Sequence, residues 1–246
     1  MTAPAIRAQH LGKRYARDLP LVLDDVNLDI AEGEFVCLLG ASGCGKSTLL
    51  NIIAGLEEPS TGTISVPDAG AAVMFQEPAL MPWLTAGRNV ELALRLRGVP
   101  REQRRAQALE LLDVVNLADA AEKRPHELSG GMRQRVALAR ALAQDRPVLL
   151  MDEPFAALDA ITRDLLHEEL ERVWRETRRT VVFVTHNVRE AARLGERVVL
   201  MSSRPGRIAG EWRLDASGPR RIESPEVSAV AIEITERLRK EITRNA

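Results

Sequence analysis

The stretch Gly40-Ala41-Ser42-Gly43-Cys44-Gly45-Lys46-Ser47 decides the fold, because it follows the pattern G-x-x-x-x-G-K-S between two different kinds of segment. The preceding run, Phe35 to Leu39, is continuously apolar and predicts a strand buried on both faces. Residues 47–54 predict a helix. Glycines allow backbone N–H groups to turn inward around phosphate oxygens, and a helix N-terminus adds a positive dipole end. We therefore expect Lys46 to reach the β- and γ-phosphates of a nucleotide and the Ser47 hydroxyl to ligate Mg²⁺. The alternative is an ordinary strand–turn–helix connection.

A second hydrophobic strand ends in two acids. The run Val148 to Met151 is followed by Asp152 and Glu153. In open α/β sheets, ligands bind at the carboxyl ends of the strands. We expect Asp152 to hold Mg²⁺ and Glu153 to act as the general base that polarises an attacking water. A solvated strand end is the alternative, and the phosphate-binding loop in the same chain argues against it.

Composition excludes several classes of protein. The 246 residues are 45% hydrophobic and 28% charged, and their formal net charge of -1 gives no sign of a basic nucleic-acid surface. No apolar run approaches the ~18 residues of a membrane span, and residues 1–10 lack the apolar core of a secretory signal. Cys37 and Cys44 fall in a predicted strand and in the glycine loop, which argues against a structural disulfide. A cytoplasmic α/β protein is favoured.

The order of patterns along the chain predicts its organisation. The first 30 residues alternate polar and apolar, as antiparallel strands do. Strand-like runs at 148–151, 181–185 and 198–201 alternate with helices and predict a mainly parallel sheet. Residues 86–116 are rich in strong helix formers, and with a helix at 131–143 they predict a helical lobe inserted into the sheet domain.

A helical stripe of apolar residues lies near the end of the chain. Its polar face mixes Glu and Arg, so we expect it to dock on the body of the protein and not on a membrane. The members of the stripe are Val227, Val230, Ala231, Ile234, Leu238 and Ile242.

A third glycine-containing motif, Leu128-Ser129-Gly130-Gly131-Met132-Arg133-Gln134-Arg135, precedes a predicted helix, and Ser129 has the chemistry of an N-cap. With this motif the sequence resembles the ATPases of ATP-binding cassette (ABC) transporters over nearly its whole length. The octet is similar to the family's signature motif. The resemblance implies that Ser129, Gly130 and Gly131 contact ATP bound to a second chain, in a head-to-tail homodimer that encloses two ATP molecules.

The resemblance also implies roles for single residues. Gln76 matches the glutamine that links the Mg²⁺ and water region to the helical lobe, and His186 matches the histidine that contacts the γ-phosphate. Asp159 matches an aspartate at the dimer interface, and Tyr15 the aromatic residue that stacks on adenine. Taken alone, each could be an ordinary surface or loop residue. The implied site then has Glu153, His186 and Gln76 as catalytic residues, Ser47, Gln76 and Asp152 as Mg²⁺ ligands, and Tyr15, Gly40, Ala41, Ser42, Gly43, Cys44, Gly45, Lys46, Ser47 and Thr48 as ATP contacts.

The implied fold is that of a P-loop NTPase: a RecA-like α/β core with a mainly parallel sheet, an N-terminal antiparallel β-subdomain and an inserted helical subdomain. We expect a single ABC ATPase domain over 1–246. Its core lobe would comprise 1–76 and 146–220, its helical subdomain 77–145, and its C-terminal helix 221–246.

The resemblance further implies a place in a transporter. Two copies would dock at the cytoplasmic face of the membrane beneath membrane-spanning permease subunits, with a solute-binding protein as an indirect partner and no nucleic acid. The segment 77–85 contains Pro-Trp-Leu-Thr, and Leu80, Trp83 and Leu84 are its candidates for permease coupling; Leu80 and Leu84 could instead pack into the helical lobe.

Two further features narrow the resemblance. Together with the Pro-Trp-Leu-Thr loop, they resemble the corresponding segments of importers of nitrate, taurine and aliphatic sulfonates. These two features are Met132 and the segment 203–208. The alternatives are a soluble ABC ATPase of iron–sulfur assembly and a DNA-associated ATPase. The Pro-Trp loop argues against the first, and the lack of a long heptad run argues against the second.

Overall fold

The computed structural model describes residues 4–156, 158–214, 220 and 224–244. The strands are β1 (Ile6–Lys13), β2 (Leu23–Ile30), β3 (Phe35–Gly40), β4 (Thr61–Ser65), β5 (Ala71–Met74), β6 (Val148–Asp152), β7 (Thr180–Thr185), β8 (Arg197–Met201) and β9 (Ile208–Arg213). The helices are α1 (Lys46–Ile53), α2 (Ala86–Leu96), α3 (Arg101–Val114), α4 (Gly130–Ala143), α5 (Ala160–Thr177), α6 (Val188–Leu194) and α7 (Pro225–Arg244), with 3₁₀ turns at Ala118–Ala120 and Pro125–Glu127.

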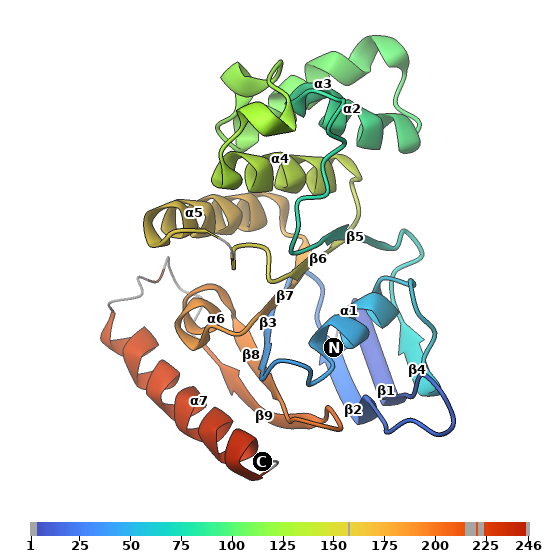
Figure 1. Ribbon diagram of the computed structural model, residues 1–246, viewed down its shortest axis with the longest axis vertical. Coiled ribbons are helices and arrows are strands. Elements are labelled where there is room, and N and C mark those ends of the chain that lie inside the picture. Colours follow the sequence, from blue (N-terminus) through green and yellow to red (C-terminus); the bar gives the residue numbers. More distant parts are fainter. Residues whose placement is uncertain (1–3, 157, 215–219, 221–223, 245–246) are drawn as a thin grey trace.

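Two sheets form the frame of the molecule (Figure 1). The larger has the order β5-β6-β7-β3-β8-β9, and its strands are parallel except β9, which pairs antiparallel with β8. The smaller is the antiparallel sheet β2-β1-β4. The predicted α/β fold with both kinds of sheet is confirmed. Strand β9 could not be predicted from the sequence, because its Ala-Gly-Glu centre lacks the β-branched alternation of a strand.

Strand β3 is buried on both faces, as its apolar run predicts. Phe35, Cys37 and Leu39 face the core that contains α4 and α5, and the Phe35 ring meets Trp174 of α5 edge-on at 5.5 Å. Val36 and Leu38 face the opposite core with α1 and the antiparallel sheet. One strand therefore supports both layers, and it delivers the glycine loop to the edge of the sheet where parallel strands end.

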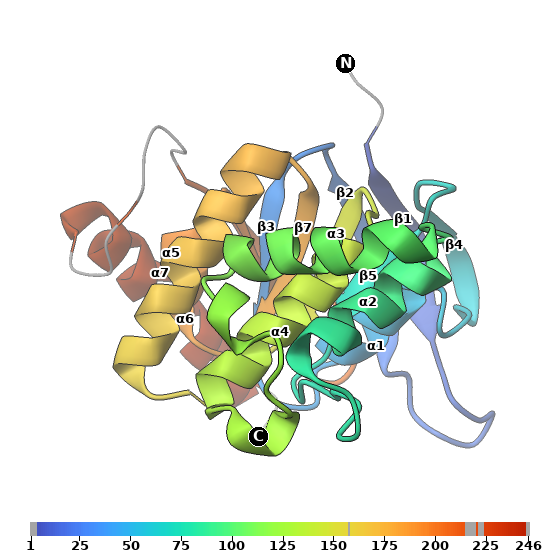
Figure 2. The same cartoon turned by 90° about the horizontal axis from the view of Figure 1, so that it is seen from above.

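Helices α2, α3 and α4 follow one another between β5 and β6, and they lie together at the end of the molecule far from α7 (Figures 1 and 2). Helix α4 is the inner one of the three, with Val136, Leu138 and Ala139 wholly buried. This arrangement places the Ser129-Gly130-Gly131 motif at the start of a helix that touches both the helical layer and the sheet layer.

Helix α7 packs beside α6 through Val227 and Ala231. Ile242 was assigned to the same apolar stripe, and this prediction is wrong: the side chain is 46% exposed. The buried positions continue instead to Glu241, three residues after Leu238, because a stripe on a straight helix alternates steps of three and four. Within the described residues, every helix is too short or too polar to cross a bilayer. The predicted boundary between 220 and 221 falls next to residues 215–219 and 221–223, which lie outside the described residues, as does Ala157.

Candidate active site

The glycine loop joins the end of β3 to α1 and has the backbone geometry that its glycines predict. Gly43 and Gly45 have positive φ angles of 75° and 99°. A Cβ atom on Gly45 would lie 2.6 Å from the Leu23 side chain, so glycine is required there on both counts. No side chain caps the N-terminus of α1 at Gly45, which leaves its first N–H groups available to an anion.

The ammonium group of Lys46 is a buried cation inside this loop. Its side chain is buried, and its Nζ donates hydrogen bonds to the carbonyl oxygens of Gly40 at 2.8 Å and Ala41 at 3.1 Å. Burial also raises the pKa of the neighbouring Cys44 thiol, so that side chain stays uncharged at neutral pH. The ammonium of Lys46 is therefore not offset by a thiolate in the loop, and Lys46 lines the pocket beside it.

A pocket of about 470 Å³ opens beside this loop. It gathers side chains from three separate strand ends, those of β3, β5 and β6. Its lining comprises Val22, Ser42, Gly43, Gly45, Lys46, Ser47, Thr48, Gln76, Asp152 and Glu153. The structure thus brings together most of the predicted nucleotide contacts, the three predicted Mg²⁺ ligands and one predicted catalytic acid.

Asp152 and Ser47 both line this pocket and are in direct contact. The Ser47 hydroxyl forms a hydrogen bond with the Asp152 carboxylate, and Gln76 lines the same space. Burial is the main cause that raises the pKa of Asp152, and the Glu153 charge adds to it, while Ser47 and Lys46 act in the opposite direction. A hydroxyl, a carboxylate and an amide oxygen form the hard oxygen donor set that suits Mg²⁺.

The raised pKa of Asp152 leads to a stability prediction. A carboxyl group whose pKa is higher in the folded than in the unfolded chain stabilises the fold when protonated, and this stability is lost as pH rises through the two values. At pH 7 without metal, Asp152→Asn should therefore raise the melting temperature by about 2–4 °C. Differential scanning fluorimetry in a chelating buffer measures it, with the exposed Asp18→Asn as the matched control. Equal melting temperatures for Asp152→Asn and the original chain would contradict the conclusion that the pKa of Asp152 is raised in the folded chain.

Glu153 and His186 follow the neighbouring strands β6 and β7 and contact each other; Glu153 lines the pocket, whereas His186 lies outside its lining. Glu153 follows β6 with a positive φ of 44°, and its N–H donates to the Val184 carbonyl of β7 at 3.0 Å. The Glu153 Oε2 atom lies 3.0 Å from His186 Nδ1. The two predicted catalytic residues, 33 positions apart, are therefore within hydrogen-bond distance.

Tyr15 lies next to the first turn of α1. Its hydroxyl is 3.3 Å from the Thr48 Oγ1 atom and donates to Glu57 Oε1 at 3.2 Å. The Lys13 ammonium lies 5.1 Å from the ring centroid, and the side chain is 55% exposed. The ring is thus fixed by its hydroxyl while part of it stays open to a ligand that enters beside Thr48.

The signature residues lie outside the pocket lining. Ser129 caps α4, and its Oγ accepts a hydrogen bond from the Met132 N–H at 3.2 Å. Ser129 and Gly130 are exposed, whereas Gly131 is buried so closely that a Cβ atom would lie 2.4 Å from Thr162 of α5. Asp159 accepts hydrogen bonds from the N–H and hydroxyl of the same Thr162, which lower the pKa of its carboxyl. Ser129, Gly130 and Asp159 thus form one exposed surface.

Gln134 has a structural role that its sequence context does not predict. Its side chain is 3% exposed, and its Nε2 donates to the Gln76 carbonyl at 2.9 Å. The contact ties the end of β5 to α4, the helix that begins at the signature motif. The only signal in the sequence was a polar residue on the inner face of a predicted helix.

The loop that contains Trp83 is held at both ends. The buried Asn89 accepts from the Met81 N–H at 2.8 Å and donates to the Thr85 carbonyl at 2.9 Å. Arg140 of α4 donates to the carbonyls of Pro78 and Ala79. Within this frame Leu80 packs partly against the core, Leu84 is half-buried, and Trp83 is 68% exposed.

The family model described as ABC transporter matches residues 23–156, which include the glycine loop, the signature motif and the acidic strand end. The chain belongs to the ABC transporter family. It is an ATP-binding subunit of that family and an ATPase, since the family's members hydrolyse ATP.

Named relatives and solved structures agree with this assignment. The taurine import ATP-binding protein TauB of Rhizobium johnstonii is 50% identical over 209 residues, which cover 82% of this chain and 79% of that protein. The uncharacterized ABC transporter ATP-binding protein MJ0412 of Methanocaldococcus jannaschii is 44% identical over 230 residues, or 91% and 86% of the two chains. The structure of the cassette MJ0796, a dimer bound to ADP and Pi, is 36% identical and has a TM-score of 0.75, covering 86% of this ABC subunit and 99% of that cassette.

Proposed function

We propose that this chain supplies the energy for an ABC importer of a small solute such as taurine, nitrate or an aliphatic sulfonate. The observation that carries the proposal is its identity of 46–50% with several proteins named taurine import ATP-binding proteins, together with the pocket beside Lys46. Nothing in the pocket would touch the solute, so the solute class is supported by relatives alone.

ATP binding would use the loop and the first turn of α1. Lys46 and the free N–H groups of the helix would hold the β- and γ-phosphates, since both are positive and preorganised. Tyr15 would stack on the base from its place beside Thr48. The oxygens of Ser47, Asp152 and Gln76 would hold Mg²⁺, which when bound would neutralise charge on the phosphate oxygens.

Hydrolysis would depend on the contact between Glu153 and His186. Glu153 would accept a proton from the attacking water as it approaches the γ-phosphorus. His186 lies 3.0 Å from the same carboxylate, so it would fix the orientation of Glu153 and reach the γ-phosphate from the neighbouring strand end. Gln76, which lines the same pocket, would contribute its amide oxygen as a ligand of Mg²⁺.

A second chain would complete the site. Cassettes of this family dimerise, as the MJ0796 structures show. In a head-to-tail homodimer, the exposed Ser129 and Gly130 with the buried Gly131 would face the γ-phosphate on the partner, and Asp159 would lie at the interface. The position of these residues outside the chain's own pocket supports this arrangement.

Trp83 is the proposed contact to a permease at the cytoplasmic face of the membrane. Import ATPases work with permease subunits, and a solute-binding protein would deliver the solute to them. An exposed tryptophan on a loop that Asn89 and Arg140 hold in place has the properties of an interface anchor. Leu80 and Leu84, which are partly buried, would anchor the loop that presents Trp83.

Trp83→Ala should separate transport from ATP hydrolysis. We expect uptake to fall at least about tenfold in cells that carry this variant, because an anchor side chain is lost, while the ATPase rate of the isolated chain stays within about twofold. Uptake of labelled taurine and nitrate measures both the coupling and the solute class. Leu96→Ala, which removes another exposed apolar side chain of the helical layer, is the control. Undiminished uptake by Trp83→Ala would contradict the docking role.

A further inference from the structure

Two segments beside the pocket are linked to the same helix, α5. The segment after β6 contains Glu153 and Phe155, and the end of β7 with the turn after it contains Thr185, His186 and Asn187. The first segment contacts α5 directly, and the second is linked to α5 through Glu190 of α6. The α5 side chain that contacts both Phe155 and Glu190 is His167, which is fully buried.

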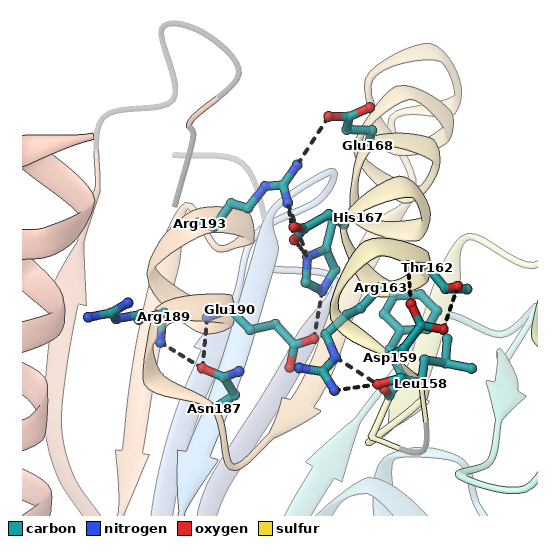
Figure 3. Close-up of polar contacts among 12 residues, drawn as sticks. Leu158, Asp159, Thr162, Arg163, His167, Glu168, Asn187, Arg189, Glu190 and Arg193 are labelled. Atoms are coloured by element: carbon teal, nitrogen blue, oxygen red, sulfur yellow. Dashed lines mark hydrogen bonds and ion pairs between the residues drawn. The ribbon is translucent and has the colours of Figure 1, made fainter. Parts of the chain in front are cut away.

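Glu190 of α6 holds the turn that carries His186. One oxygen of its buried carboxylate, Oε2, accepts a hydrogen bond from the Thr185 hydroxyl. That hydroxyl oxygen in turn accepts from the Asn187 N–H at 3.0 Å. Asn187 closes the turn by accepting from the Arg189 N–H at 3.0 Å through its own side chain (Figure 3). The two neighbours of His186 are therefore fixed by one side-chain network.

His167 holds the other oxygen of Glu190. Its Nε2 lies 2.6 Å from Glu190 Oε1, and Arg193 Nη1 lies 3.2 Å from its Nδ1 (Figure 3). Because a guanidinium can only donate, Nδ1 must accept, and the ring proton is on Nε2, which donates to Glu190. Arg193 is itself fixed by Asp164 at 3.2 Å. Glu190 and Arg193 therefore hold the His167 ring at its two nitrogens.

The ring of His167 also touches the segment that carries Glu153. The centroids of the His167 and Phe155 rings are 5.6 Å apart, and Phe155 is buried two residues beyond Glu153. Arg163, also on α5, donates to the Phe155 carbonyl at 3.4 Å and to the Leu158 carbonyl at 2.7 Å. Helix α5 therefore fixes this segment on one side and, through His167 and Glu190, the turn of His186 on the other.

We propose that His167 and Glu190 are positioning residues for ATP hydrolysis, which hold the turn of His186 and the segment of Glu153 at the separation that hydrolysis requires. Neither residue touches the nucleotide pocket. The network acts through the 3.0 Å contact between Glu153 and His186, and the inference therefore rests on the proposed function of those two residues. A buried carboxylate is costly unless its oxygens are hydrogen-bonded, and both oxygens of Glu190 are used to orient chain segments.

Thr185→Val is the sharpest test, because it removes one hydroxyl and almost no volume. We expect its kcat for ATP to fall about tenfold, with KM and the affinity for a non-hydrolysable ATP analogue within about twofold. Thr185→Ser keeps the hydroxyl and should restore kcat. His167→Gln, which retains one donor and one acceptor, should keep kcat within about threefold, while His167→Leu should lower it as Thr185→Val does.

A double-mutant cycle separates positioning from a general loss of structure. If the network acts through His186, Thr185→Val should cause no further fall in kcat when His186→Ala is already present. Thr177→Val is the matched control, since it removes a hydroxyl from the C-terminal end of α5, outside the network. Melting temperatures of all variants report whether each one folds.

The outcomes are distinguishable. A tenfold fall in both backgrounds, or loss of analogue binding by Thr185→Val, would overturn the positioning role in favour of a structural one. A full kcat for Thr185→Val, with His186→Ala impaired, would overturn this inference alone. A full kcat for His186→Ala would overturn the proposed role of His186 and the inference with it.

Discussion

Lys46→Ala is expected to abolish nucleotide binding, with a loss of affinity for ATP of at least about 100-fold. The Lys46 ammonium is buried inside the glycine loop and hydrogen-bonded to the Gly40 and Ala41 carbonyls, so it is already desolvated and oriented before a ligand arrives. A triphosphate gains a charge-assisted contact there at little reorganisation cost. Alanine leaves the loop carbonyls facing the phosphates with no cation between them, which adds repulsion to the lost attraction.

Isothermal calorimetry with ATP in the absence of metal measures this loss directly. Lys123→Ala removes an exposed lysine of the helical layer and should bind ATP as the original chain does. Because Lys46 also bonds to the loop, its variant must be shown to melt cooperatively. A folded Lys46→Ala chain that binds ATP with unchanged affinity would contradict the prediction that residues 40–47 bind the phosphates of ATP.

Glu153→Gln is expected to lower kcat by about 10²–10⁴-fold and to leave ATP binding intact. An amide has nearly the same size and can still form a hydrogen bond with His186, so the geometry at the rim of the pocket is kept. It cannot accept a proton from water at neutral pH. The ATP-bound state then persists, and with it the dimer that we propose ATP to hold together.

Size-exclusion chromatography with light scattering, run with ATP and Mg²⁺, should show a stable dimer of Glu153→Gln and a monomer for the same chain without nucleotide. Glu110→Gln changes an exposed carboxylate of α3 in the same way and should hydrolyse ATP at the original rate. A Glu153→Gln chain that stays monomeric and turns over ATP normally would exclude both the general-base role and the ATP-held dimer.

The glycine loop could be predicted from the sequence because its geometry is local. Glycines at positive φ, a buried strand before them and a helix after them are encoded within about 20 consecutive residues, and the structure contains each of these features. The acidic strand end was predictable for the same reason. The family resemblance supplied what a single segment cannot, namely that Gln76 and Asp152 line one pocket.

Contacts between distant segments could not be predicted from the sequence. The meeting of Glu153 with His186 depends on β6 lying next to β7, an order of strands that no local pattern encodes. Asn89 and Arg140 were overlooked because a polar residue on a helix gives no sign that its partner is a loop carbonyl. The network of His167 and Glu190 joins two helices in the same way.

The error at Ile242 has a different cause. Ile242 and Glu241 are adjacent, so a small rotation of α7 decides which one faces the body of the protein. Hydrophobicity favours burial of Ile242, whereas the alternation of three- and four-residue steps favours burial of Glu241. The Glu241 carboxylate lies 3.5 Å from Arg237, one turn earlier. Along this helix, the regular alternation of three- and four-residue steps therefore outweighs the hydrophobicity of a single residue.

The two anchors of the Trp83 loop have a mechanical consequence. Asn89 fastens the loop to α2, and Arg140 fastens it to α4, the helix whose N-cap is Ser129. If Trp83 contacts a permease as proposed, a displacement of that contact would reach α2 through Asn89 and α4 through Arg140 at the same time. Because Ser129 is the N-cap of α4, the same displacement would move the surface that we propose to face ATP bound to a partner chain.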